Sequence, residues 1–192
     1  GIPVARHEIK SQQDIICGNV MPTPYVIKPV NEGSSVGVHV IRKGMHEPLF
    51  TESGWPFGDR VMVEEYIAGR EMTVSVMGDR ALGVTEITTS HGFYDYDAKY
   101  EEGGSNHVIP ANIPDVLAGT LMNYAVKAHQ TLGCRGISRA DFRFDGENAF
   151  ILEVNTQPGM TPTSLVPEQA AYVGMSFEDL VTWMIENAEC DS

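Results

Sequence analysis

Short apolar runs that alternate with polar residues, or are rich in β-branched residues, fill most of the first half of the chain. Bounded by turns that contain glycine and proline, such runs are typical of β-strands. The expected strands cover 24–29, 36–42 and 60–67, followed by a hairpin over 71–89 that turns at Gly78-Asp79. The stretch 46–59 contains two prolines and two glycines, which predicts a loop with at most a short helix.

Two later segments have the 3.6-residue spacing of amphipathic helices. In 115–133 the apolar stripe consists of Val116, Leu117, Leu121, Ala125, Ala128 and Leu132. The final helix begins at Ser176, which forms a capping box with Asp179, and its apolar face is Phe177, Leu180, Val181, Met184 and Ile185. Antiparallel strand pairs with interleaved helices predict an α+β fold.

A second hairpin, over 138–155, carries polar residues on one face. Facing residues of an antiparallel pair have a constant index sum, so a loop of three or five residues places Asp141 opposite Glu153 and Arg139 opposite Asn155. A loop of even length would place Asp141 opposite Leu152 and mix charged with apolar groups on one face. The pattern therefore favours the odd loop and predicts two carboxylates, an amide and an arginine on one patch.

This patch has two interpretations. Carboxylate and amide oxygens without His or Cys nearby are hard ligands that suit Mg²⁺. The alternative is a solvated sheet face with an ordinary Arg–Asp pair, which contributes little to stability. The loop 155–164, which follows directly and is polar, can offer backbone amides to an anion.

Two further loops are candidate nucleotide contacts. In VIKPVNEGSSVGVHV (26–40) Lys28 precedes a glycine-serine loop, and the β-branched run after it predicts a strand where a P-loop would have a helix. Its amides and the hydroxyls of Ser34 and Ser35 could line a phosphate, or the segment is a plain hairpin turn. The long loop 90–107 contains FYDYDAKY and is either a lid that excludes water or a surface loop with an aromatic cluster.

Composition narrows the classes of partner. The formal net charge of −13 argues against nucleic acid, whose phosphates require a basic surface. Three widely spaced cysteines without a C-x-x-C motif indicate neither a disulfide framework nor a zinc site, and favour a reduced, cytoplasmic compartment. No apolar run has the length of about 18 residues that a membrane span needs. The apolar opening, GIPVARHEIK, is expected of a fragment that begins inside a domain.

Taken together, six segments resemble the D-alanine–D-alanine ligases, ATP-grasp enzymes of peptidoglycan precursor synthesis. They are VIKPVNEGSSVGV, VEEYIAGREMTV, FYDYDAKY, LGCRGISRADFRF, LEVNTQPGMTPTSLVP and GMSFEDLV, in the family's order. The similarity extends from about residue 22 to the end of the chain. It implies an ATP-grasp fold with ATP held between two α+β subdomains, here over 1–66 and 67–192, without the family's N-terminal α/β domain.

The resemblance also implies roles for individual residues. It implies ATP contacts at Lys28, Ser34, Ser35, Val36, Glu64, Glu65, Ile67, Glu71 and Lys99. It implies that Asp141, Glu153 and Asn155 bind two Mg²⁺ ions, with Mn²⁺ as an alternative. Arg139 and the amide of Gly159 would stabilise an oxyanion. Ser164 and Leu165 would contact the second D-alanine, and Tyr100 with Ser34 would form a polar link across the lid.

The implied reaction joins two D-alanines through an acylphosphate, and the implied whole protein is a cytoplasmic homodimer with no nucleic-acid or membrane partner. Because half of the substrate site is expected to lie outside this chain, the chain alone is expected to be inactive. Gln157 departs from the family, where Ser or Leu is common. Two alternatives stay open: another ATP-grasp carboxylate–amine ligase, or a nucleotide-binding module without catalysis. The retained Arg139 argues against the module, because a pure binder needs no oxyanion donor.

Overall fold

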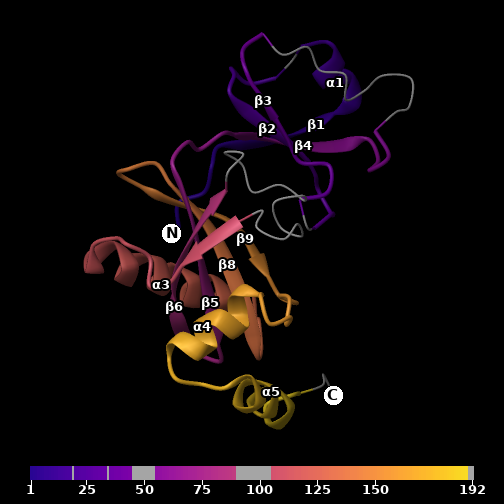
Figure 1. The fold of residues 1–192 in the computed structure, drawn as a ribbon. Coiled ribbons are helices and arrows are strands. Elements are labelled where there is room, and N and C mark those ends of the chain that lie inside the picture. The colour runs from indigo at the N-terminus through magenta and orange to yellow at the C-terminus, as the bar shows by residue number, and fades with distance from the viewer. Residues whose placement is uncertain (19, 34, 45–54, 90–104, 190–192) are drawn as a thin grey trace. The chain divides into compact units, whose positions relative to one another are not determined.

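The computed structural model describes residues 1–189 except 19, 34, 45–54 and 90–104, and it is an α+β protein with two antiparallel sheets, as predicted (Figure 1). The described residues form two compact units. The N-terminal unit contains residues 5–67, and the C-terminal unit contains 1–4, 68–89 and 105–189. Within the described ranges no helix is both long and apolar enough to cross a membrane.

The N-terminal unit is a four-stranded sheet in the order β1-β4-β2-β3. Its strands are β1 (His7–Ser11), β2 (Tyr25–Pro29), β3 (His39–Ile41) and β4 (Arg60–Glu65). The short helix α1 (Gln12–Ile16) begins with a capping box from Ser11 and buries Ile15 against the sheet core. The structure confirms the strands expected around 24–29 and 60–67 and shortens that at 36–42. Most of the loop expected at 46–59 lies outside the described residues.

The C-terminal unit is a five-stranded sheet in the order β7-β6-β5-β8-β9. Its strands are β5 (Arg70–Met77), β6 (Arg80–Thr89), β7 (Ser105–Val108), β8 (Ile137–Phe144) and β9 (Ala149–Asn155). The hairpin predicted over 71–89 is confirmed, with Gly78 at the turn in a positive-φ conformation. The prediction of a loop over 90–107 is wrong at residues 105–107, which belong to β7 and pair with β6. β7 is an edge strand with one neighbouring strand, so it can be largely polar. Its sequence therefore gave no strand signal.

Helices cover both faces of this sheet (Figure 1). On one face α3 (Asp115–Thr131) packs against apolar side chains of β5 and β8, among them Met72, Val74 and Phe142. On the other face α4 (Leu165–Tyr172) and α5 (Phe177–Glu186) cover Met77, Leu82 and Ile137. The sequence pattern did not predict α4, which has eight residues and Pro167 in its first turn, where proline is tolerated.

The predicted apolar stripes of two helices are correct in the middle and wrong at their ends. In α3 Leu121, Ala125 and Ala128 are buried, whereas Val116 is 83% exposed and Leu132, which lies just after the helix, is 65% exposed. In α5 the Ser176 capping box is confirmed and Leu180 is buried, but Phe177 and Ile185 are 47% and 72% exposed. Helical periodicity continues past the part of a helix that a sheet can cover, so the terminal positions stay in solvent.

Candidate functional site

Polar side chains gather on the face of the central sheet that carries α4. On β5 the alternating residues Glu71, Thr73 and Ser75 lie opposite Arg143, Asp141 and Arg139 of β8, respectively. Successive strand residues point to opposite faces, so these six share one face while Met72 and Val74 point into the α3 core. Farther along the same face, α4 and α5 cover apolar side chains. We call the polar part of this face the polar sheet face.

Arg139 and Asp141 form the centre of this face. Arg139 Nε donates to Asp141 Oδ1 at 2.9 Å, and Nη2 donates to Oδ2 at 2.8 Å. The Thr73 hydroxyl also donates to Asp141 Oδ1, at 2.6 Å. The Arg139 and Asp141 side chains are only 12% and 13% exposed, so this bidentate pair is largely shielded from solvent.

Glu153 and Asn155 complete the patch that the sequence predicts. Asp141 pairs with Glu153, and Arg139 pairs with Asn155. The loop between β8 and β9 is nevertheless 145–148, with four residues, so the expectation of an odd loop is wrong. A β-bulge between Asp141 and Phe142 compensates: Phe142 pairs with Ile151, which leaves Leu152 as the extra residue.

The oxygens of the patch fit a hard divalent cation. Glu153 is exposed at the edge of the patch, and the Asn155 Oδ1 accepts from the amide of Gln157 at 3.0 Å. Carboxylate oxygens have about two lone-pair sites each, so the bonds from Arg139 and Thr73 leave Asp141 able to bind a metal. Among the described residues no group of three His, Cys, Asp or Glu side chains forms a metal site. Asp141, Glu153 and Asn155 offer two carboxylates and an amide, which are oxygen ligands that suit Mg²⁺ better than zinc.

A second ion pair lies farther along the same strands. Arg143 is buried and donates to Glu71 Oε2 at 3.1 Å and to the Gly69 carbonyl at 2.9 Å. Gly69 has φ of 120°, and a side chain there would collide with the carbonyl of Phe144. The bend before β5 thus requires glycine. Arg143, which bonds to the Gly69 carbonyl, also holds Glu71, one of the expected ATP contacts.

The loop after β9 brings the other expected substrate contacts together. Ser164 Oγ accepts from the amide of Thr161 at 3.0 Å and lies 2.8 Å from the Thr161 hydroxyl. Gly159 lies so close to Ser164 that an added Cβ would meet Ser164 Oγ at 2.9 Å. Leu165, the first residue of α4, is 5% exposed. Any substrate contact of Leu165 therefore involves its backbone, because its side chain is buried.

The N-terminal unit brings together Lys28 and Glu64, two of the expected nucleotide contacts. Lys28 Nζ lies 2.6 Å from Glu64 Oε2 across β2 and β4, and both side chains are largely buried. Glu65 ends β4, and its amide donates to the carbonyl of Arg6 at 2.8 Å. Ile67 follows at the end of this unit.

The glycine-serine loop is a strand–loop–strand segment, as predicted. It connects β2 to β3, and Ser35 and Gly37 have φ of 60° and 70°. The amide of Val36 donates to the Gly33 carbonyl at 3.0 Å, so in this conformation it closes a turn. Ser34, Lys99, Tyr100 and the lid expected over 90–107, apart from 105–107 in β7, lie outside the described residues.

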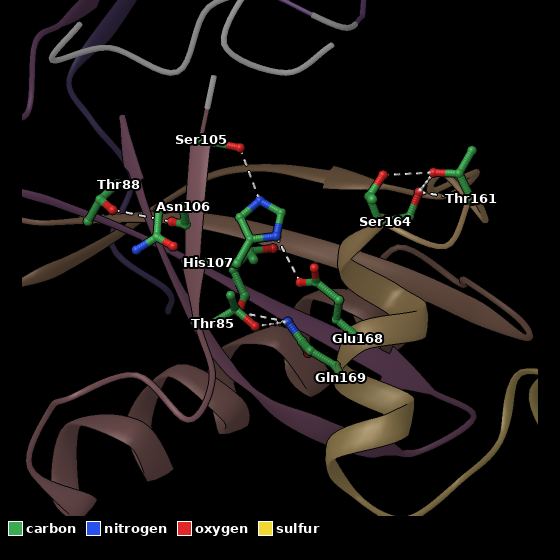
Figure 2. A network of polar contacts seen from close by, with 11 residues as sticks. Thr85, Thr88, Ser105, Asn106, His107, Thr161, Ser164, Glu168 and Gln169 are labelled. Carbon is green, nitrogen blue, oxygen red and sulfur yellow. Dashed lines mark hydrogen bonds and ion pairs between the residues drawn. The ribbon is translucent and has the colours of Figure 1, made fainter. Parts of the chain in front are cut away.

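Sequence reasoning missed a polar network around α4 (Figure 2). His107 Nδ1 lies 2.8 Å from Glu168 Oε2, and Ser105 Oγ lies 3.2 Å from His107 Nε2. The next residue, Gln169, is fully buried and bonded to β5 and β6. Ser105–Val108 is polar apart from Val108, so the sequence pattern contained no signal that could have identified His107.

Family comparison identifies relatives of this chain. Residues 2–186 match the family model described as D-ala D-ala ligase C-terminus. The chain is 56% identical over 191 residues to the D-alanine–D-alanine ligase of Rhodospirillum rubrum, covering all of this chain and 63% of that relative. The chain thus spans less than two thirds of the length of that curated relative.

Solved structures give the same family. A D-alanine–D-alanine ligase from Bacillus anthracis complexed with ATP matches 97% of this chain and 61% of its own, with 26% identity and a TM-score of 0.75. The VanG D-Ala:D-Ser ligase from Enterococcus faecalis matches 97% of this chain and 57% of its own, with 29% identity and a TM-score of 0.79. These similarities confirm the α+β, ATP-grasp fold expected from the sequence.

Proposed function

Because the chain belongs to the D-ala D-ala ligase C-terminus family, we propose that it supplies the nucleotide, cation and acceptor sites of an ATP-dependent ligase that joins two D-alanines. The observation that carries this proposal is the polar sheet face, where Arg139, Asp141, Glu153 and Asn155 are paired across β8 and β9. The ATP complex of the Bacillus anthracis relative supports ATP as the nucleotide.

Asp141, Glu153 and Asn155 would hold Mg²⁺ or Mn²⁺, which neutralises charge on the phosphates when bound. Thr73 and Arg139 orient the Asp141 carboxylate from two directions, so its oxygens are fixed before a cation arrives. Lys28 and Glu64 lie where the nucleotide contacts are expected. We propose that Glu71, which Arg143 holds in place, contacts the ribose, and that Ser34, Ser35, Glu65, Ile67 and Lys99 complete the nucleotide site.

Arg139 has a second role in the acyl step. The terminal phosphoryl group of ATP passes to the carboxylate of the first D-alanine, which gives an acylphosphate and ADP. The amine of the second D-alanine attacks the acyl carbon, and the tetrahedral intermediate, which carries an oxyanion, loses phosphate and a proton to give the amide. The guanidinium has five N–H donors, so it can hold Asp141 and donate to this oxyanion together with the amide of Gly159. Ser164 and the backbone of Leu165, close to Gly159, would contact the acceptor. Tyr100 with Ser34 would close the site from the lid.

The first experiment measures D-alanine-dependent release of ADP and phosphate by the full-length protein, with D-alanyl-D-alanine identified by mass spectrometry. D-serine, D-lactate and L-alanine as alternative acceptors define specificity, and D-alanine is expected to be preferred. Glu153→Gln should abolish turnover, because it removes a charged cation ligand. Unchanged turnover in Glu153→Gln would contradict the metal assignment, and a different preferred acceptor would contradict the substrate.

The whole protein's further properties belong to the same proposal. We propose that the whole protein is a cytoplasmic homodimer. We also propose that its substrate site includes residues outside the 192 residues of this sequence. The isolated chain should therefore release no ADP in response to D-alanine. D-alanine-dependent ADP release by the isolated chain would overturn this part.

A further inference from the structure

Gln169 is a fully buried amide at the centre of α4's contact with the sheet (Figure 2). Its Oε1 accepts from the amide of Ser75 at 2.8 Å. Its Nε2 donates to the Thr73 carbonyl at 3.2 Å and to the Thr85 hydroxyl at 3.0 Å. One side chain therefore joins α4 to two neighbouring strands, β5 and β6.

The bonds lie where the sheet itself is irregular. The register of β5 against β6 shifts between Ser75 and Val76, so regular ladder pairing is interrupted there. A buried backbone group without a partner is costly, and the Gln169 amide supplies one acceptor and one donor at this point. An apolar residue of the same size would fill the space but lose the bonds to the Ser75 amide and the Thr73 carbonyl.

Thr73 connects Gln169 to the polar sheet face through two hydrogen bonds. Its carbonyl accepts from Gln169, while its hydroxyl donates to Asp141 Oδ1 at 2.6 Å. Thr73 is fully buried, so both bonds are shielded from water. A continuous chain of hydrogen bonds thus runs from α4 through Thr73 to Asp141 and on to Arg139.

The same helix carries the expected acceptor contact. Ser164 immediately precedes α4, and its carbonyl accepts from the amide of Glu168 at 3.2 Å. Glu168 in turn is held by His107 of β7. Two consecutive residues, Glu168 and Gln169, therefore fix the first turn of α4 against β5, β6 and β7.

We propose that Gln169 is a positioning residue that sets the acceptor end of α4 and the cation carboxylate Asp141 in fixed relation, acting through Thr73. This inference rests on the proposed function, because it assigns Asp141 to a cation and Ser164 to the acceptor. In this assignment Gln169 contacts neither the cation nor the acceptor. It affects the binding of both through the hydrogen bonds of its buried side-chain amide.

The test compares Gln169→Met, Thr73→Val, the double variant and a control in the full-length protein. Methionine has nearly the length of glutamine without its hydrogen bonds, and valine suits a strand, so Thr73→Val folds even if Gln169→Met does not. The control, Ser138→Ala, removes a buried bond to His129 on the α3 face of the same sheet. All variants are assayed well below their melting temperatures.

Two readouts separate positioning from mere stabilisation. Mn²⁺ affinity, followed by electron paramagnetic resonance in the presence of ADP, requires no turnover. The KM of the acceptor D-alanine is measured separately from kcat. In Thr73→Val and Gln169→Met the Kd for Mn²⁺ should rise by about tenfold, the lower end of the range for groups that orient metal ligands. The acceptor KM should rise in Gln169→Met, and the double variant should be less than additive.

Ser138→Ala should lower the melting temperature while leaving the Kd for Mn²⁺ and the acceptor KM within about twofold of the unsubstituted protein. The Ser138 side chain lies on the α3 face of the sheet, opposite the face that carries Asp141. The proposal is overturned if Thr73→Val and Gln169→Met behave like this control, or if the unsubstituted protein binds no Mn²⁺. If the variants differ from the unsubstituted protein in the Kd for Mn²⁺ as expected, but the unsubstituted protein joins no D-alanine, the proposed reaction is refuted and the positioning role stands.

Discussion

At the scale of single residues, the Arg139–Asp141 fork is the centre of the proposed site. Two parallel hydrogen bonds at 2.9 and 2.8 Å depend on a planar guanidinium. We expect Arg139→Lys to keep the charge and lose the fork. If Arg139 has the proposed oxyanion role, kcat of the full-length protein should fall about 10²- to 10³-fold, the usual loss for one oxyanion donor. Steady-state kinetics with D-alanine measure this loss.

A second bidentate pair provides the matched control for that substitution. Arg70 donates to Glu86 through Nε at 2.7 Å and Nη2 at 2.6 Å. It lies on the same sheet, next to Met72 and away from the polar sheet face. Arg70→Lys should leave kcat within about twofold, because the Arg70 side chain lies on the opposite face of the sheet from Arg139 and Asp141. Equal losses in the two variants would mean that the effect is structural.

His129 gives a residue-scale prediction about stability. It is 3% exposed, and burial lowers its pKa below the ordinary value of 6.5. The unfolded chain therefore binds a proton more readily than the folded protein. The free energy of unfolding should be highest above pH 6.5 and should decrease as pH falls through 6.5 toward the lower folded pKa.

Urea unfolding of the isolated chain at several pH values measures this dependence, with His129→Gln as the comparison. The substitution should flatten the decrease below pH 6.5, because the titrating group is gone. His39, whose pKa burial also lowers, stays in both proteins and cancels in the difference. Parallel pH profiles of the two proteins would contradict the prediction.

At the scale of elements, the β8–β9 hairpin shows how far the sequence could predict the site. Polar patterning placed Asp141 opposite Glu153 correctly, because burying charged groups on the α3 face would be costly. The loop length was predicted wrongly, because a bulge at Leu152 restores the pairing and leaves no trace in the pattern of polar and apolar residues. The pattern of polar and apolar residues thus predicts which face of the sheet a residue occupies near the core. It does not predict the loop length or the bulge that gives this pairing.

The bulge makes a prediction about two single-residue deletions. Deleting Leu152 removes the extra residue and should keep Glu153 opposite Asp141. Deleting Val154 should move Asn155 onto the apolar α3 face, because a shift of one residue exchanges the faces of a strand. We expect the Val154 deletion to reduce ligase activity by more than about 10²-fold and the Leu152 deletion by less than about tenfold, as judged from losses in misplaced metal ligands. Equal activity of the two deletions would contradict this register.

The network around α4 shows what the sequence could not predict. His107 and Glu168 are 61 residues apart, and their contact depends on β7 and α4, neither of which has a clear periodic signal. Gln169 meets backbone groups at a β5–β6 bulge, which again has no sequence signature. Contacts of this kind arise from tertiary packing, whereas the helix cap at Ser176 is local and was predicted correctly.

At the scale of the whole molecule, overall composition and the combined motifs differed in how much they indicated about function. The bulk charge of −13 excluded nucleic acid as an expected partner but did not indicate a ligase. Spacing alone left a turn, a lid and a metal patch each with an alternative interpretation. The family resemblance selected among them, because six short segments in order are far more specific than any one of them. The confirmed family and fold therefore depended on the combination of motifs.

The path of the first residues gives a prediction about the C-terminal unit. Residues 1–4 belong to this unit, where Val4 forms a parallel bridge with Ile151 and the amide of Ile151 donates to the Pro3 carbonyl at 3.0 Å. They lie along β9, which ends the described sheet order. Removing residues 1–4 from the 192-residue chain should uncover this edge and leave the Ile151 amide to water.

Hydrogen–deuterium exchange followed by NMR measures this effect at single amides. The Ile151 amide should exchange about five- to tenfold faster in the shortened chain, since a protein hydrogen bond contributes about 1 kcal/mol. The amide of Phe142, on the neighbouring inner strand, serves as the control and should keep its rate. Acceleration at both amides would mean that the whole unit is destabilised, and no change at Ile151 would mean that residues 1–4 do not protect β9. Selective acceleration at Ile151 would establish the segment as the cover of the strand that carries Glu153 and Asn155.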